Sequence, residues 1–199
     1  GEGGDKVNEA GEMDESQVSP CHPVTVSPCH GFRMPAEWEP HAATWLSWPH
    51  NRETWPGCFA AVEPAMVEVA AALGESEMVR VNVQDEAHAR HVRKLLGRAV
   101  PPERLALHHV PTNDAWIRDH GAFIVRGGAV GGLVALDFDY NAWGGKYPPY
   151  DRDQAVARAM AAILGVPAQK PGIVLEGGSI DVNGEGVLLT TEQCLLNPN

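Results

Sequence analysis

The spacing of hydrophobic residues predicts three helices. Apolar positions recur at helical intervals over residues 59–73, 85–97 and 151–165, and each segment ends at or just before a glycine. Asp85 is a helix-capping residue type at the start of the second segment. Pro64 lies where a helix would begin or kink. We therefore expect three amphipathic helices, separated by segments of other periodicity.

Alternating and short apolar runs predict strands between and after these helices. Residues 78–83 and 104–110 have strand-like patterns, and 122–127 with 132–139 form a predicted hairpin across a Gly-Gly pair. Two further short strands are predicted within 173–191, around an Asn-Gly turn. The predicted order is helix, strand, helix, strand, hairpin, helix, hairpin.

This order indicates an α/β fold built from a repeated αβ module, because the pattern starts again near Asp151. Four tryptophans precede the first helix, and we expect most of them to pack at an edge of the core; they are Trp38, Trp45, Trp48 and Trp55.

Residues 1–33 differ from the rest of the chain. They are rich in Gly, Glu, Ser and Pro and lack apolar periodicity, so we interpret them as a disordered leader or a non-native extension. The ordered domain would then span residues 34–199. The N-terminus has no basic segment followed by an apolar one, so no signal peptide is predicted. No apolar run approaches the ~18 residues of a membrane span, and we expect no membrane association.

The charge of the chain argues against nucleic acid as a partner. The formal net charge is -11, of which the leader carries -4 and the remainder -7. The four cysteines do not form a dense disulfide framework, so a cytoplasmic location is expected. Cys21-His22 and Cys29-His30 form a near-repeat, but it lacks short Cys-x-x-Cys spacing and a metal site there is disfavoured.

The stretch "NDAWIRDHGAF" (113–123) contains candidate binding residues. Asp119 precedes a glycine and a predicted strand, so its carboxylate could accept paired hydrogen bonds from a guanidinium. It could equally pair with Arg118 or cap the turn. Trp116 could form the wall of a cation pocket or belong to the core. His120 could act as a base, although a structural role is the simpler interpretation.

The stretch "LEGGSIDVNG" (175–184) contains the second candidate group. Glu176 ends a predicted apolar strand and precedes Gly177 and Gly178, which permit close backbone approach. A glutamate at such a corner could orient a catalytic histidine, or it could be a surface acid beside a simple bend.

Two other segments are less specific. The loop "NAWGGKYPPYDRD" (141–153) could contact a ligand through its aromatic residues and Lys146, or simply cover the fold. "RGGAVGG" lacks the ending of a phosphate-binding loop, so nucleotide binding is not expected.

Four of these segments together resemble the agmatine deiminase family, within the guanidino-group-modifying (pentein) superfamily. They are "MPAEWEPHAATWLSWPHN", "DAWIRDHG", "DFDYNAWGGKYPPYDRD" and "LEGGSIDVNGEGVLLTTEQCLLNPN". The resemblance covers nearly all of residues 34–199. It implies a five-bladed αβ propeller, incomplete in this chain, that turns agmatine into N-carbamoylputrescine and ammonia without a metal or organic cofactor. A homo-oligomer would be possible at full length.

The resemblance also implies roles for individual residues. Asp119 would pair with the substrate guanidinium, Trp116 would line the same pocket, and Glu176 would orient the catalytic histidine. Gly177 and Gly178 would allow that corner to form, with Arg118 as a supporting residue.

The chain departs from the family pattern in one important respect. The family's catalytic His-x-Asp motif and nucleophilic Cys lie beyond the "LLNPN" region, and none of the nine histidines here lies in such a motif. A smaller departure is Ala122, where members usually have proline. We therefore expect an N-terminal portion that is inactive alone. Alternatives are a guanidinium- or polyamine-binding protein without catalysis, and a deiminase acting on arginine or peptidyl arginine.

Overall fold

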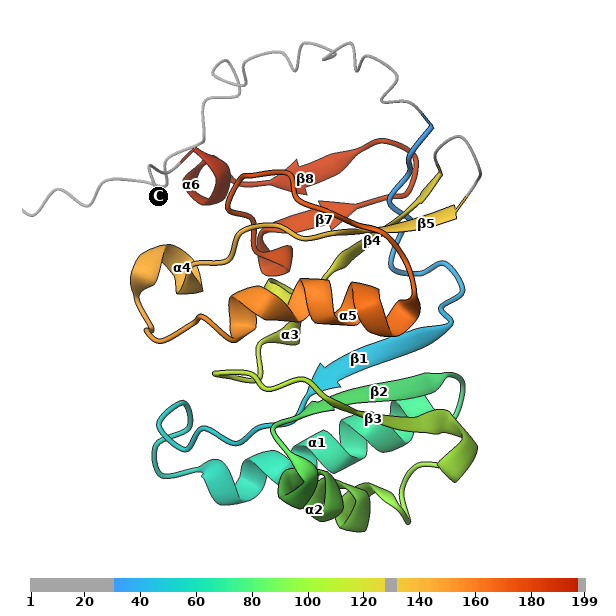
Figure 1. Cartoon of the computed structure of the whole chain (residues 1–199), viewed down its shortest axis with the longest axis vertical. Helices are drawn as coiled ribbons and strands as arrows, with labels where there is room; N and C mark the ends of the chain where they lie inside the picture. The colour runs from blue at the N-terminus through green and yellow to red at the C-terminus, as the bar shows by residue number, and fades with distance from the viewer. Residues whose placement is uncertain (1–30, 128–131, 197–199) are drawn as a thin grey trace, which may run out of the picture.

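The computed structural model describes residues 31–127 and 132–196 (Figure 1). They form a mixed α/β structure with three small sheets, as the order of predicted elements indicated. Most of the predicted leader, and the pairs Cys21-His22 and Cys29-His30, lie outside the described residues. Arg33 already belongs to the fold, because its backbone pairs with that of Arg126.

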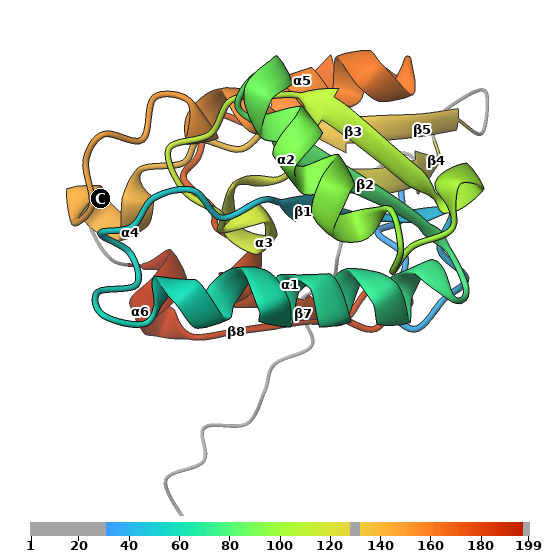
Figure 2. The ribbon, with the colours of Figure 1, turned by 90° about the horizontal axis from the view of Figure 1, so that it is seen from below.

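The first sheet is parallel, with strand order β1-β2-β3. Its strands and connecting helices are β1 (Ala43–Ser47), α1 (Phe59–Gly74), β2 (Met78–Val83), α2 (Glu86–Leu96) and β3 (Leu105–His109). Both helices lie on the same side of this sheet (Figures 1 and 2). Because the strands are parallel, all three end at the same edge of the sheet, and the loops that follow them lie at this edge.

The predicted helices and strands of this unit are confirmed, with small corrections. Pro64 lies early in α1 without ending it. The Asp85 side chain accepts a hydrogen bond from the His88 backbone N–H at 2.8 Å, which caps α2. Gly97 ends α2 in a right-handed conformation, not the left-handed one that a terminal glycine often adopts. A short 3-10 helix, η2 (Pro102–Arg104), precedes β3.

The second sheet contains the first predicted hairpin. β4 (Phe123–Gly127) and β5 (Gly132–Leu136) are antiparallel, and β6 (Ala168–Gln169) pairs with β5 in parallel. The predicted helix over 151–165 is shorter than expected. It consists of a 3-10 turn, η3 (Asp153–Ala155), followed by α5 (Val156–Leu164).

The third sheet is the second predicted hairpin. β7 (Ile180–Val182) and β8 (Leu188–Thr190) are antiparallel and precede the short helix α6 (Glu192–Leu195). The strand expected before Glu176 is reduced to an isolated bridge between Val174 and Asp139. It is followed by a 3-10 turn, η4 (Gly177–Ser179).

The core consists of three buried clusters. The largest lies between the first sheet and its two helices and includes Trp48, Val79, Val81, Val92 and Leu96. Smaller clusters contain Val156 and Met160 of α5, or Phe123 and Ile180 of the other two sheets. The expectation for the tryptophans holds for fully buried Trp48 but is wrong for Trp38, which is 76% exposed. Among the described helices, none has the length and apolar character needed to cross a membrane.

Candidate functional site

A cavity of about 920 Å³ lies where loops from distant parts of the chain meet. Figures 1 and 2 show the segments after β1 and after β3 on the same side of the molecule as α4 (Ala142–Gly145). Three segments provide most of the lining: 51–54 after β1, 113–119 after β3, and 140–149 around α4, with Asp153 of η3. Parallel strands commonly place binding sites beyond their carboxyl ends, as the first sheet does here.

The charges that line this cavity favour a cation. Four carboxylates and a single ammonium group face it; they are Glu53, Asp114, Asp119, Asp153 and Lys146. A concave surface with an excess of one sign concentrates ligands of the other sign. Both Asp119 and Trp116, which the sequence singled out, are among the lining residues.

Asp119 is held at the cavity by the predicted glycine corner. It lies in the one-turn helix α3 (Ile117–His120), and its Oδ1 accepts a hydrogen bond from the Gly178 N–H at 3.0 Å. Burial raises the pKa of Asp119, while the Gly178 N–H and the charge of Arg118 act in the opposite direction. The alternative of an ion pair between Asp119 and Arg118 is not observed, because the guanidinium of Arg118 pairs with Glu37.

The corner formed by Gly177 and Gly178 leaves little space for a side chain at either position. A Cβ added to Gly177 would overlap the carbonyl oxygen of Arg118, and one added to Gly178 would overlap Oδ1 of Asp119. Arg118 also donates from Nε to the Gly177 carbonyl at 3.1 Å. The segments 118–119 and 177–178, about sixty residues apart in the chain, are therefore in direct backbone contact.

Trp116 belongs to an aromatic group at the cavity. Its ring is 40% exposed and lies 5.9 Å from Trp55 and 6.2 Å from Trp143, between ring centroids. Trp143 and Tyr147 of the loop around α4 also line the cavity, together with Lys146. The interpretation of Trp116 as ordinary core is therefore wrong.

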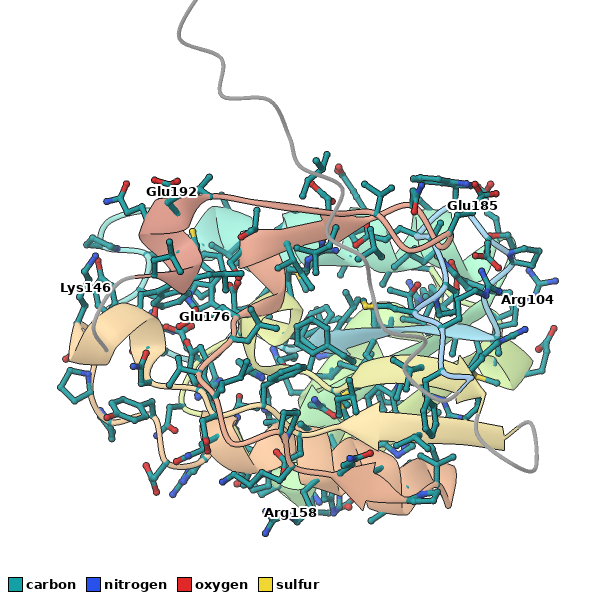
Figure 3. The ribbon with its side chains drawn as sticks, turned by 90° about the horizontal axis from the view of Figure 1, so that it is seen from above. Arg104, Lys146, Arg158, Glu176, Glu185 and Glu192 are labelled. Carbon is teal, nitrogen blue, oxygen red and sulfur yellow. The ribbon has the colours of Figure 1, made fainter. Side chains whose placement is uncertain are left out.

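Glu176 lies close to the same group of acids. It is half-buried and does not line the cavity itself. Figure 3 places it well inside the outline of the molecule, whereas Lys146 lies at the rim, directly after α4. The pKa of the buried Tyr140 hydroxyl is raised by burial and by the charges of Asp153, Asp119, Glu176 and Asp114. The charges of these four carboxylates therefore all act on Tyr140, which lines the cavity.

Several lining residues were not identified individually from the sequence, among them Asp114, Tyr140 and Asp153. Asp153 Oδ1 accepts hydrogen bonds from the N–H groups of Asn113 at 2.7 Å and Asp114 at 3.3 Å. In return, the Asn113 side chain accepts from the backbone N–H of Asp153 at 3.2 Å. This reciprocal clamp joins segments forty residues apart, so local spacing contains no signal for it.

His120 is buried, with 3% of its surface exposed, and does not line the cavity. Burial lowers its pKa to about 4, and its ring packs edge-to-face against Tyr140. The structural interpretation of this histidine therefore fits its position better than a role as a base.

The described cysteines, Cys58 and Cys194, are exposed and lie outside the cavity lining. Within residues 31–127 and 132–196, no group of three or more His, Cys, Asp or Glu side chains has an arrangement suited to a metal ion.

Comparison with known proteins identifies relatives of this chain. Residues 33–199 match the family model described as Porphyromonas-type peptidyl-arginine deiminase. An agmatine deiminase from Ectopseudomonas mendocina is 41% identical over 182 residues, which cover 88% of this chain and 48% of the relative.

Two solved structures extend this similarity to the fold. The agmatine deiminase of Enterococcus faecalis has a TM-score of 0.74 at 36% identity, covering 84% of this chain and 46% of that one. A substrate-bound C315S agmatine deiminase from C. jejuni has a TM-score of 0.73 at 31% identity, covering 84% of this chain and 47% of that one. The chain thus spans about half the length of the curated relatives that it matches.

Proposed function

The chain belongs to the Porphyromonas-type peptidyl-arginine deiminase family, and we propose that it provides the substrate-binding half of an agmatine deiminase. The reaction converts agmatine and water into N-carbamoylputrescine and ammonia. In this proposal a cysteine thiolate attacks the guanidinium carbon, the C–N bond to the leaving nitrogen breaks as ammonia departs, and water then releases the ureido product.

The observation that carries the proposal is the placement of Asp119 in an acidic, aromatic-walled cavity. A carboxylate held by the Gly178 N–H has further lone pairs with which to accept hydrogen bonds from a guanidinium. Pairing would hold the substrate and withdraw charge from its central carbon. Trp116 would pack against the flat cation, as aromatic faces do with guanidinium groups.

The remaining family residues have supporting roles in this proposal. Glu176 would orient the catalytic histidine, and Gly177 and Gly178 keep Glu176 and Asp119 close together. The histidine and the nucleophilic cysteine would come from sequence beyond residue 199. The positions of Cys58 and Cys194 outside the cavity are consistent with this division of roles.

The charge of the cavity favours agmatine over arginine. Agmatine is a dication, whereas arginine also carries a carboxylate that the four lining acids would repel. Lys146 is the only cationic side chain in the described lining that could offset this repulsion. Peptidyl arginine also lacks that free carboxylate. It differs from agmatine because it lacks the second positive charge.

We further propose that the three sheets described here are parts of a five-bladed propeller that the other half of the protein completes. The coverage of about half of each relative supports this architecture. A homo-oligomeric state at full length and a cytoplasmic location remain predictions.

Turnover by the whole protein, expressed from its complete reading frame, tests the function. We expect ammonia and N-carbamoylputrescine from agmatine, and a fall of about 100-fold or more in kcat/KM for Asp119→Asn. Glu86→Gln on the exposed surface of α2 is the control for loss of one charge. Preferential turnover of arginine would contradict the substrate, and loss of activity in both variants would contradict the role of Asp119.

A protein that binds guanidinium without catalysis is the second candidate, because the cavity is formed without a cysteine. Calorimetric titration with agmatine separates the two. Micromolar binding without turnover by the whole protein would favour the binding protein, and turnover would exclude it.

A further inference from the structure

We infer that Asp114 is the specificity-determining residue that binds the second positive charge of the substrate. The inference rests on the proposed function and concerns the end of the substrate remote from the guanidinium. Asp114 and Asp119 line the same cavity, and Trp116, which lies between them in the sequence, also lines it. A cavity lined by two anionic groups and by aromatic rings fits a ligand chain with a cation at each end.

Asp114 is held rigidly by its neighbours. Its Oδ2 accepts a hydrogen bond from the hydroxyl of Thr54, which belongs to the loop after β1. Its Oδ1 accepts from the Ala115 N–H at 2.7 Å. The Asp114 N–H in turn donates to Asp153 at 3.3 Å. A carboxylate fixed on both oxygens and at its backbone loses little conformational entropy when a ligand binds.

These contacts leave acceptor capacity for a ligand. An ionised carboxylate offers about four lone-pair positions, and the described contacts use two of them. An alkylammonium group has three N–H donors and no acceptor, so it matches the remaining capacity. Asp114 can therefore bind an ammonium group without giving up the bonds that position it.

The other cavity acids are less suited to this role. Asp153 uses Oδ1 for two backbone N–H groups, and burial raises its pKa to about 6, so it loses its charge as pH falls through about 6. Glu53 is exposed at the rim, where water competes for its charge. Asp119 is bound to Gly178 beside the predicted catalytic corner.

The aromatic group explains why the two ends would be joined by an apolar chain. Trp116 packs between Trp55 and Trp143, with ring centroids 5.9 and 6.2 Å away. These rings offer an apolar surface to methylene groups and a negative face to either cation. A ligand with one charge would use only half of this arrangement.

The test compares two substrates in the whole protein, expressed from its complete reading frame. Agmatine is matched with 1-pentylguanidine, in which a methyl group replaces the terminal ammonium. We expect Asp114→Asn to lower kcat/KM for agmatine by about 10- to 100-fold, the range for one hydrogen bond between charged groups. Turnover of 1-pentylguanidine should change little, which also shows that the variant is folded.

Three further variants separate the explanations. Asp119→Asn should lose activity on both substrates, and Glu86→Gln should lose it on neither. Thr54→Val keeps the carboxylate but removes the bond that positions it, so it should raise KM for agmatine more than for 1-pentylguanidine. An equal loss on both substrates in Asp114→Asn would overturn the inference. If the unaltered protein turns over neither substrate, the proposed function itself fails.

Discussion

At the scale of single residues, His120 and Asp153 form a buried pair with opposite pH behaviour. His120 Nε2 lies 3.8 Å from Asp153 Oδ1. Burial lowers the pKa of the histidine to about 4 and raises that of the aspartate to about 6. In the unfolded chain the values are about 6.5 and about 3.9. The contribution of the histidine to the free energy of unfolding is therefore lost as pH falls through about 4. The contribution of the aspartate is lost as pH rises through about 6.

These two effects oppose each other between about pH 4 and pH 6, so single substitutions should separate them. Relative to the unaltered protein, Asp153→Asn should gain stability as pH rises over this interval, because the opposing contribution of the aspartate is removed. Relative to the same reference, His120→Phe, which keeps a ring against Tyr140, should lose about 1–3 kcal/mol of stability as pH rises over this interval. Urea unfolding of the whole protein from pH 4 to 7 measures both slopes, and slopes of the same sign would contradict the assignment.

The glycine corner makes a second residue-scale prediction. Gly177→Ala places a methyl group against the rigid backbone of Arg118 and should cost about 1–3 kcal/mol of stability. Gly178→Ala meets the side chain of Asp119, which can rotate away, so it should cost less stability but weaken agmatine binding.

Gly132→Ala is the control, because nothing lies within 4 Å of its added Cβ. Chemical denaturation and calorimetric titration of the three variants give both quantities. Equal stability loss at Gly177 and Gly132 would refute the packing argument.

Local sequence identifies site residues when their neighbours in the chain explain them. Local spacing made Asp119 and Trp116 candidates but left a turn cap or a core position open; the family resemblance implied the pocket role, and both line the cavity. Asp153 could not be found in this way. Its partners Asn113 and Asp114 are brought to it only by the packing of α5 behind β5, and the sequence contains no local trace of that contact.

At the scale of elements, α4 is a left-handed turn that local propensity disfavours. Ala142, Trp143, Gly144 and Gly145 all have positive φ, and the first two are not glycines. Each non-glycine residue in this region costs about 1–2 kcal/mol. The turn brings Trp143 to the cavity beside Trp116, so the strain is located at the proposed site.

Replacing Ala142 with glycine tests this strain. Ala142→Gly and Ala89→Gly in α2 each remove one buried methyl group and add the same freedom to the unfolded chain. Only the first relieves a left-handed conformation. We therefore expect Ala142→Gly to be less destabilising than Ala89→Gly by about 1–2 kcal/mol in guanidinium unfolding of the whole protein. Similar losses would show that the turn is unstrained.

The strength of the local hydrophobic pattern explains which elements could be predicted from the sequence. α1, α2 and β2 have clear periodicity and were located within a residue or two. β1 was missed because its tryptophans suggested an irregular core edge, although Ala43–Ser47 pair in register with β2. β6 has two residues and depends on pairing with β5 for its definition. Short elements are determined by tertiary contacts rather than by their own pattern.

At the scale of the whole molecule, the described residues leave one apolar face uncovered. β8 is exposed along its length, with Leu188 at 50% and Leu189 at 67%, and Leu196 after α6 is 76% exposed. Within residues 31–127 and 132–196, β8 pairs only with β7. The relatives are about twice as long as the segment that matches this chain. We therefore propose that, in the whole protein, a segment corresponding to the other half of the relatives covers this face.

The 199-residue chain in isolation should therefore self-associate through this face, because exposed apolar strands with a free edge pair with one another. Leu189→Lys should increase the monomer fraction in sedimentation velocity and leave the melting temperature nearly unchanged, since the side chain it replaces is already exposed. Val69→Lys, at an exposed apolar position on α1, should have no such effect because a helix offers no free edge. A monomeric chain that melts sharply would show that the three small cores suffice without the other half.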